Sequence, residues 1–182
     1  MTPASIALSR FGYGISPRDT PQSDPRRSLL RQIDGFDPAP AVITARINTR
    51  AKTAEMIDLV RTLRQETRSM AEMAQTGAAP MAEGMAPENP RAAALAGLPP
   101  EFREKLAEAG RVLVDDVAVR VNLAITSPTP MMERLVHFWS NHFSVSVGKL
   151  GTQFEVGPHE FNAIRPHVLG RFAEMLKAAV LH

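Results

Sequence analysis

The sequence contains no cysteine, which excludes disulfides, thiolate metal sites and a cysteine nucleophile. No apolar run approaches the roughly eighteen residues that a membrane span needs. The first residues lack the basic-then-apolar pattern of a secretory signal. The formal net charge of +2 is too small to indicate a nucleic-acid surface. These absences exclude several classes of protein without indicating a reaction.

Apolar residues make up 44% of the 182 residues, which is enough for a core and excludes wholesale disorder. This length suits one domain. The aromatic residues are uneven: none occurs between Phe36 and Phe102, whereas six of ten fall between Phe138 and Phe172. All five histidines lie in the last quarter of the chain. Because aromatic rings dominate core burial and histidine is the usual acid, base or ligand at neutral pH, packing and candidate chemistry both point there.

The first third of the chain is predicted to form three helices, and two of them carry a helix-start signal. Residues 3–11 are predicted to form a short helix, and Asp24-Pro25 predicts a capped helix that stops at Gly35. Asp37-Pro38 repeats the signal and predicts a long amphipathic helix to about residue 74 that packs along one side. The apolar residues of that side recur at three-and-four spacing: Val42, Ile43, Ile47, Ala51, Ala54, Ile57, Val60 or Leu59, and Leu63.

Residues 75–100 hold five prolines, three glycines, many alanines and no aromatic residue, which predicts a linker or loose insertion. A second long helix is predicted from Pro100 to about Ile125. Residues 117–123 also alternate like a strand, but the helical run-up from Glu101 favours the helix. Its expected apolar stripe consists of Val114, Val117, Val121, Ala124 and Ile125.

Ser127-Pro128 ends that helix, and Thr129-Pro130 begins the next one. A strong apolar stripe predicts its core face: Met132, Leu135, Val136, Trp139 and Phe143. Glu133 and His137 lie on the far side, where an exposed pair is favoured over half of a metal site or an acid/base pair. His137 and His142 are five residues apart and point about 140° away from each other, so one ion cannot easily bind both.

His142 and Arg165 each admit two interpretations. His142 borders the apolar stripe, where a hydrogen bond to a buried carbonyl is favoured over a catalytic or ligand role. Pro166 is expected to break one short helix and to start the final helix, whose free N–H groups would suit an anion beside Arg165. The favoured alternative is a buried Arg165 that pairs with a carboxylate such as Glu160. The loop at 146–152 lacks phosphate-loop spacing, so no nucleotide is expected.

Three segments resemble a known bacterial family. Residues 133–143, Glu-Arg-Leu-Val-His-Phe-Trp-Ser-Asn-His-Phe, resemble the signature of the family called domain of unknown function 1800. Residues 161–172, which contain Ile-Arg-Pro-His followed by Gly and Phe, resemble its second signature, and residues 7–14 resemble the stretch near its start. The three matches appear in family order and span most of the chain.

The resemblance implies a mostly helical bacterial protein, often exported and often encoded beside a sulfatase-like family, but it supplies no reaction. Gly157-Pro158-His159-Glu160 stands where relatives commonly have a Glu-Arg pair, which puts the role of that acidic residue in doubt. Relatives also run much longer. We therefore expect these residues to be the N-terminal part of a larger helical domain, or a truncated gene product.

The sequence thus predicts an all-α, irregular multi-helix bundle with long amphipathic helices and one Ala/Pro-rich linker at 75–100. The favoured function is an interaction or scaffold module that works with a partner protein. The alternative is a hydrolase-type enzyme in which four residues converge on one pocket: Asn141, His142, Arg165 and His167. No cofactor and no metal is expected. If His142 and His167 reach one shared cavity, the enzyme is favoured; separate packing favours the scaffold.

Overall fold

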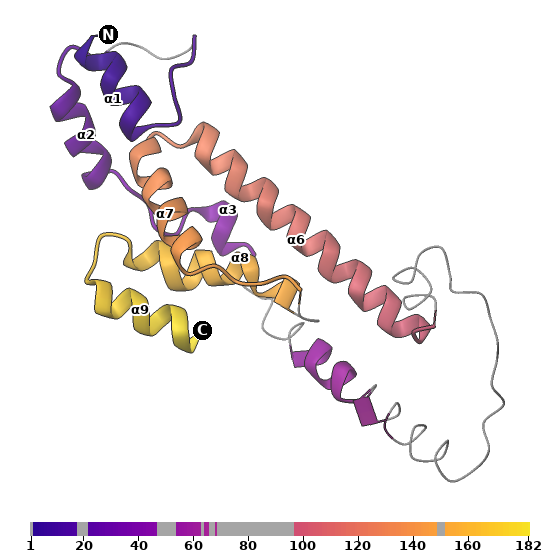
Figure 1. The fold of residues 1–182 in the computed structure, drawn as a ribbon. Coiled ribbons are helices and arrows are strands. Elements are labelled where there is room, and N and C mark those ends of the chain that lie inside the picture. Colours follow the sequence, from indigo (N-terminus) through magenta and orange to yellow (C-terminus); the bar gives the residue numbers. More distant parts are fainter. Residues whose placement is uncertain are drawn as a thin grey trace, which may run out of the picture.

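The computed structural model describes residues 2–17, 22–46, 54–62, 64–65, 68, 97–148 and 152–182. These residues form helices joined by turns, and no strand occurs among them (Figure 1). The predicted all-α class is therefore confirmed. The predicted linker lies outside the described residues as far as residue 96.

The first two helices, α1 (Pro3–Phe11) and α2 (Pro25–Asp34), lie side by side at one end of the molecule (Figure 1). The Thr2 hydroxyl accepts a hydrogen bond from the Ser5 amide, and the Asp24 carboxylate accepts one from the Arg27 amide. Each cap precedes a proline in the first turn, which the sequence predicts for Asp24-Pro25. Neither helix contains a buried residue, and we call α1 and α2 the N-terminal helix pair.

The predicted helix start at Asp37-Pro38 is wrong. The Asp37 carboxylate accepts a hydrogen bond from the Ala39 amide two residues on, which makes a turn and not a helix cap. A short helix, α3 (Ala41–Thr44), follows and places Ile43 in the core. Helix resumes at residues 54–62, so the described residues do not form one continuous helix from 38 to 74.

Two helices carry the C-terminal half, and both predicted ends of the first and the predicted start of the second are confirmed. Helix α6 (Pro100–Thr126) is the longest, at 27 residues, and α7 (Pro130–His142) turns back from it (Figure 1). The predicted stripe on α7 does pack into the core. The predicted stripe on α6 does not, because Val114, Val117 and Val121 are exposed and the opposite side of the helix is buried.

A compact helical segment at residues 156–167 lies against α6, α7 and the last helix. It follows a 3-10 turn at Thr152–Phe154 and comprises α8 (Val156–Pro158), a π-helix (His159–Ile164) and a second 3-10 turn (Arg165–His167). The predicted break at Arg165-Pro166 is therefore wrong, because the helical path continues through that proline. The final helix, α9 (Phe172–Leu181), begins six residues after Pro166. No anion site can thus be assigned to a helix start at Pro166.

In the described part of the chain, the core consists of three clusters that run along α6 and α7. The largest joins α7 to the 156–167 segment and α9 through Met132, Val136, Ile164, Val168 and Met175. A second packs Met56, Phe102, Ala109 and Phe154 together, and a third packs Ile43 with Val119 and Phe161. No helix among the described residues is long and apolar enough to cross a bilayer.

Candidate functional site

The 156–167 segment brings charged side chains into the interior because part of it is a π-helix. The Arg165 amide donates to the Glu160 carbonyl, a bond between residues five apart. In an α-helix such residues would point about 140° away from each other. The wider π turn instead lets Glu160 and Arg165 both reach the neighbouring helices. Since π-helices often occur at functional sites, the 156–167 segment is a candidate functional site.

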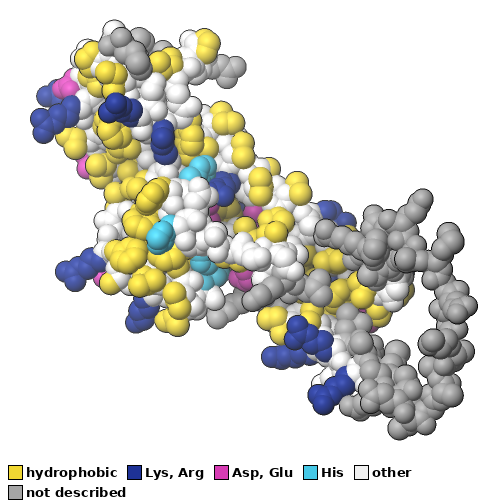
Figure 2. All heavy atoms as spheres, in the orientation of Figure 1, with side chains coloured by type: hydrophobic (Ala, Val, Ile, Leu, Met, Phe, Trp, Pro, Cys, Tyr) yellow, Lys and Arg dark blue, Asp and Glu magenta, His cyan; other side chains and the backbone are white. Residues whose placement is uncertain are grey.

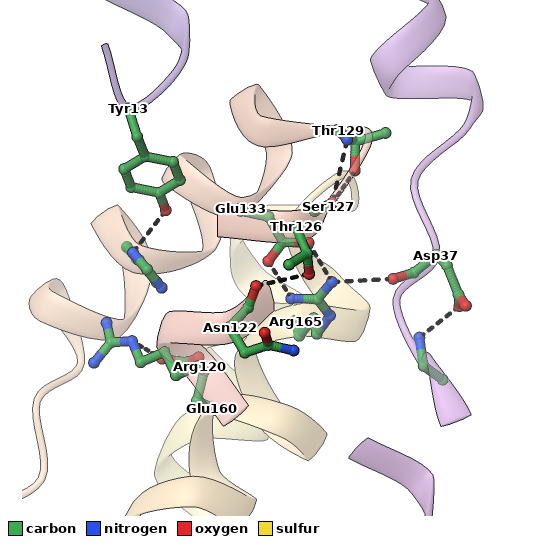
Figure 3. Close-up of polar contacts among 12 residues, drawn as sticks. Tyr13, Asp37, Arg120, Asn122, Thr126, Ser127, Thr129, Glu133, Glu160 and Arg165 are labelled. Carbon is green, nitrogen blue, oxygen red and sulfur yellow. Dashed lines mark hydrogen bonds and ion pairs between the residues drawn. The ribbon is translucent and has the colours of Figure 1, made fainter. Parts of the chain in front are cut away.

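Arg165 and Glu133 form a buried, two-pronged ion pair. Arg165 Nη1 lies 2.6 Å from Glu133 Oε2, and Nη2 lies 2.7 Å from Oε1 (Figure 3). Nη2 also donates to the Asp37 carbonyl at 3.2 Å, and the guanidinium lies 4.9 Å from the Phe36 ring centroid. The side chains of Arg165 and Glu133 are only 3% and 2% exposed. The pair therefore joins α7, the 156–167 segment and the turn after α2.

A second ion pair lies beside the first. Arg120 Nε of α6 is 3.0 Å from Glu160 Oε2 (Figure 3). Burial raises the pKa of the Glu160 carboxyl, and the neighbouring Arg120 opposes that rise. We call Arg120, Glu133, Glu160 and Arg165 the charged cluster.

The third polar contact, between Tyr13 and His137, lies closer to solvent. The two side chains are 2.7 Å apart, from the Tyr13 hydroxyl to His137 Nδ1 (Figure 3). Burial, the nearby Arg120 and Arg165 lower the pKa of His137 to about 4, with Glu133 opposing them. Burial and Glu133 raise the pKa of Tyr13 to about 12. At neutral pH the Tyr13 hydroxyl and the neutral His137 imidazole therefore share one hydrogen bond, in which the tautomer of the ring sets the donor.

The family profile described as "Protein of unknown function (DUF1800)" matches residues 6–182. The chain belongs to this family. The match confirms the resemblance carried by the three sequence segments. No curated protein and no solved structure matched the chain. The description of DUF1800 names no reaction, so the function has to be argued from the residues themselves.

The structure places the four predicted site residues of this DUF1800 chain in different surroundings. Arg165 is buried in its ion pair, His167 is half-buried, and Asn141 and His142 are exposed. The His142 ring contacts Trp139 and Phe143, at centroid distances of 5.6 Å and 4.8 Å. No hydrogen bond or ion pair within the described part of the chain joins any two of the four predicted residues.

Glu133 and Arg165 have partners other than those that the sequence favours. The expected exposed pair of Glu133 with His137 is wrong, because Glu133 is buried against Arg165. Burial of Arg165 against a carboxylate is right, but that carboxylate is Glu133 and not Glu160. Sequence reasoning missed Tyr13 and Arg120 as site residues: Tyr13 lies in the first family-like segment but was given no role, and Arg120 lies outside all three segments. For the burial of Glu133 the sequence did carry a signal, because this charged residue follows Met132 of the apolar stripe and precedes Leu135.

Two cavities among the described residues stand out, and none of the four predicted residues lines either. One is a small apolar space of about 30 Å³ between α1, α2 and Pro130. The other is an open cleft of about 340 Å³ beside α9, lined in part by Phe143, Glu155 and His159. Within the described ranges, no three His, Cys, Asp or Glu side chains gather so that they could hold a metal ion.

The pKa of His137 predicts how acid acts on the fold. With a pKa of about 4 in the folded state against 6.5 for the unfolded chain, the unfolded chain binds a proton first as pH falls. The contribution of His137 to stability is therefore complete above pH 6.5 and is lost between pH 6.5 and about 4. The free energy of unfolding, measured by urea titration, should fall less steeply over this range in His137→Asn than in the unchanged protein.

When the two proteins are compared, the contributions of the other titrating groups to the pH dependence of stability cancel. Glu160 and Asp116 have raised pKa values, so they take up protons in the folded state and act in the opposite direction, but they do so in both proteins. Parallel pH profiles of the unchanged protein and His137→Asn would contradict the assignment of a neutral, partly buried His137.

Proposed function

We propose that this chain is an interaction module that binds an amphipathic helix of a partner protein along one face of α6. One observation carries the proposal. Four aliphatic side chains of α6 remain exposed: Val114 by 67%, Val117 by 48%, Val121 by 49% and Ile125 by 77%. We call these four residues the α6 stripe. Hydrophobic side chains follow α6 along the edge of the molecule (Figure 2).

The α6 stripe has the geometry of a helix-binding seam. Its members are three or four residues apart, so they fall within an arc of about 80° at 100° per residue. The buried residues of α6, including Ala109 and Val119, lie on the opposite side. An apolar row at this spacing is the feature by which helices dock against one another. Contiguous exposed apolar surface of this kind commonly marks a binding surface.

The charged cluster supports the same proposal, because its charges are used within the fold. Both nitrogens at the end of Arg165 and both oxygens of Glu133 are engaged in one ion pair. Such a pair fixes the positions of the helices relative to one another, so that α6 presents the α6 stripe in a defined orientation. The hydrolase alternative requires Asn141, His142, Arg165 and His167 to converge on one pocket, and no described contact or cavity favours it.

The partner is expected to present an apolar helix face with leucine, isoleucine or valine at three-and-four spacing, because such a face matches the α6 stripe. The resemblance to the family makes a sulfatase-like protein one candidate for that partner. This identity rests on the resemblance alone. The chemistry of the surface itself specifies an apolar helix.

We expect Val121→Glu to weaken partner binding by about tenfold or more, because a charge in the middle of an apolar seam loses its hydration on docking. The measurement is cross-linking in the source cells followed by quantitative mass spectrometry of the captured partner. Glu104→Lys, on an exposed site of the same helix outside the stripe, is the matched control and should bind normally. Melting temperatures of both variants should stay close to that of the unchanged protein, since both positions are exposed.

Equal capture by the unchanged protein and Val121→Glu would contradict the proposal. Light scattering on the purified chain separates a further outcome. If the unchanged protein is a dimer and Val121→Glu is a monomer, the α6 stripe binds a second copy of the chain and not a partner protein.

A further inference from the structure

The N-terminal helix pair is held on α7 by polar contacts between complementary groups. Arg134 Nη1 donates to the Gly12 carbonyl at 2.7 Å and to the Ser9 carbonyl at 3.2 Å. The Met131 amide, in the first turn of α7, donates to the Gln32 side-chain oxygen at 2.8 Å. The Tyr13 hydroxyl completes the set with its bond to His137. Each contact therefore joins α7 to a group at or near the C-terminal end of α1 or α2.

Apolar packing contributes little to this attachment. No residue of α1 or α2 is buried. Leu8 and Leu29 are half-buried. Four other large apolar side chains of the pair are between 38% and 53% exposed: Ile6, Phe11, Leu30 and Ile33. The small cavity between the two helices and Pro130 leaves further surface without contact. Elements with few buried apolar side chains are those that open locally without global unfolding.

The chain directly after α2 is anchored in the core. Phe36 packs against the largest core cluster and lies beneath the Arg165 guanidinium. The Asp37 carbonyl accepts a hydrogen bond from Arg165, and Ile43 of α3 is 1% exposed. If the helix pair moves, the hinge must therefore lie between Gly35, the C-cap of α2, and Phe36.

We propose that the N-terminal helix pair is a lid that opens as a unit about the Gly35–Phe36 junction and exposes a binding face on α7. This inference is independent of the α6 stripe, which lies on another helix. The face that the lid covers presents hydrogen-bond donors, the Arg134 guanidinium and the Met131 amide, together with the His137 imidazole. In the closed state they are occupied largely by carbonyl oxygens.

The occupant of the closed state indicates the class of ligand for the open state. Carbonyl oxygens at the end of a helix and a carboxamide oxygen now fill the donors of α7. A peptide segment that presents carbonyl or carboxylate oxygens offers the same acceptors and would compete with the lid. The lid is thus an autoinhibitory contact for acceptor-rich peptides.

Hydrogen exchange followed by mass spectrometry on the whole chain tests the lid. Peptides from α1 and α2 should exchange together, and faster than peptides from the 156–167 segment. Tyr13→Phe removes one hydrogen bond and should speed exchange in both helices by about fivefold. Arg134→Met removes the two hydrogen bonds that the charged guanidinium donates, and it should speed exchange in both helices by about tenfold or more. Neither change should alter exchange in the 156–167 segment.

Two measurements complete the test. Arg26→Gln, at an exposed site of α2, is the matched control and should leave all exchange rates unchanged. Acylation of His137 by diethyl pyrocarbonate should accelerate in Tyr13→Phe, because an opened lid uncovers the imidazole. If α1 and α2 exchange only as slowly as the 156–167 segment, or if Tyr13→Phe speeds both regions equally, the pair unfolds with the core and the lid is overturned. If Arg134→Met does not fold, Tyr13→Phe decides alone.

Discussion

Replacing Glu133 by alanine is expected to lower the free energy of unfolding by about 3–5 kcal/mol. The substitution leaves the Arg165 guanidinium, whose side chain is 3% exposed, without the carboxylate that neutralises it. An uncompensated buried charge is among the costliest single changes in a folded protein. Because small domains are stable by only about 5–15 kcal/mol, this one change should remove a large part of the total.

A double variant separates the cost of a broken pair from the value of the pair itself. Glu133→Leu with Arg165→Met replaces both charges by apolar side chains of similar size, and it should recover most of the stability lost in Glu133→Ala. The matched control is an exposed pair of the same chemistry. Arg61 and Asp58 lie 3.3 Å apart with side chains 72% and 75% exposed. Arg61→Met should cost less than about 1 kcal/mol.

Urea unfolding followed by circular dichroism measures all four proteins. A loss in Glu133→Ala no larger than the loss in Arg61→Met would show that Arg165 finds solvent or another partner. The ion pair would then not be the structural link between α7 and the 156–167 segment that its two hydrogen bonds indicate.

Helix ends were predictable where the sequence carries a local signal. Asp24-Pro25 and Thr129-Pro130 start helices at the expected residues, because a cap or a proline acts within one turn and needs no tertiary contact. Asp37-Pro38 carries the same two residue types and forms a turn instead. There Arg165 binds the Asp37 carbonyl, so a long-range contact overrides the local signal.

Buried faces were less predictable, because periodicity shows that a helix has an apolar face but not which face is covered. On α6 the valine stripe is exposed, whereas Asp116 and Val119 are buried. Asp116 lies on the covered side because Arg46 pairs with it at 3.4 Å. On α7 the wheel places Glu133 opposite the core, but the 156–167 segment covers that side as well. A helix buried on two sides cannot be recognised from one stripe.

The candidate site depends on pairings between distant residues, and these were beyond sequence reasoning. Tyr13 and His137 are 124 residues apart, and Arg165 and Glu133 are 32 apart. The π-helix is a further obstacle, because no residue pattern in 159–164 distinguishes it from an ordinary turn of α-helix. The family motifs did locate Glu133 and Arg165, but they did not indicate that the two residues bind each other.

Replacing Gly157 by alanine is the second change with a large expected effect. Gly157, the second residue of the 156–167 segment, lies against Asp116 of α6. A Cβ atom there would lie 2.1 Å from Asp116 Oδ2 and 2.8 Å from Asp116 Cβ. The Asp116 residue is 5% exposed, so its short side chain has no room to turn away. One of the two helices must therefore shift, which should cost about 3 kcal/mol in unfolding free energy.

Gly110 of α6 supplies the matched control, because a Cβ atom built there meets nothing within 4 Å. Gly110→Ala should stabilise the protein by about 0.5–1 kcal/mol, since alanine loses less backbone entropy in a helix. Removing the obstructing carboxylate should restore part of the loss: Asp116→Ala combined with Gly157→Ala should show a favourable coupling of about 1–2 kcal/mol in a double-mutant cycle. Additive effects would place the strain of Gly157→Ala elsewhere, and they would remove the contact between Asp116 and Gly157 as the reason that only glycine fits at this position.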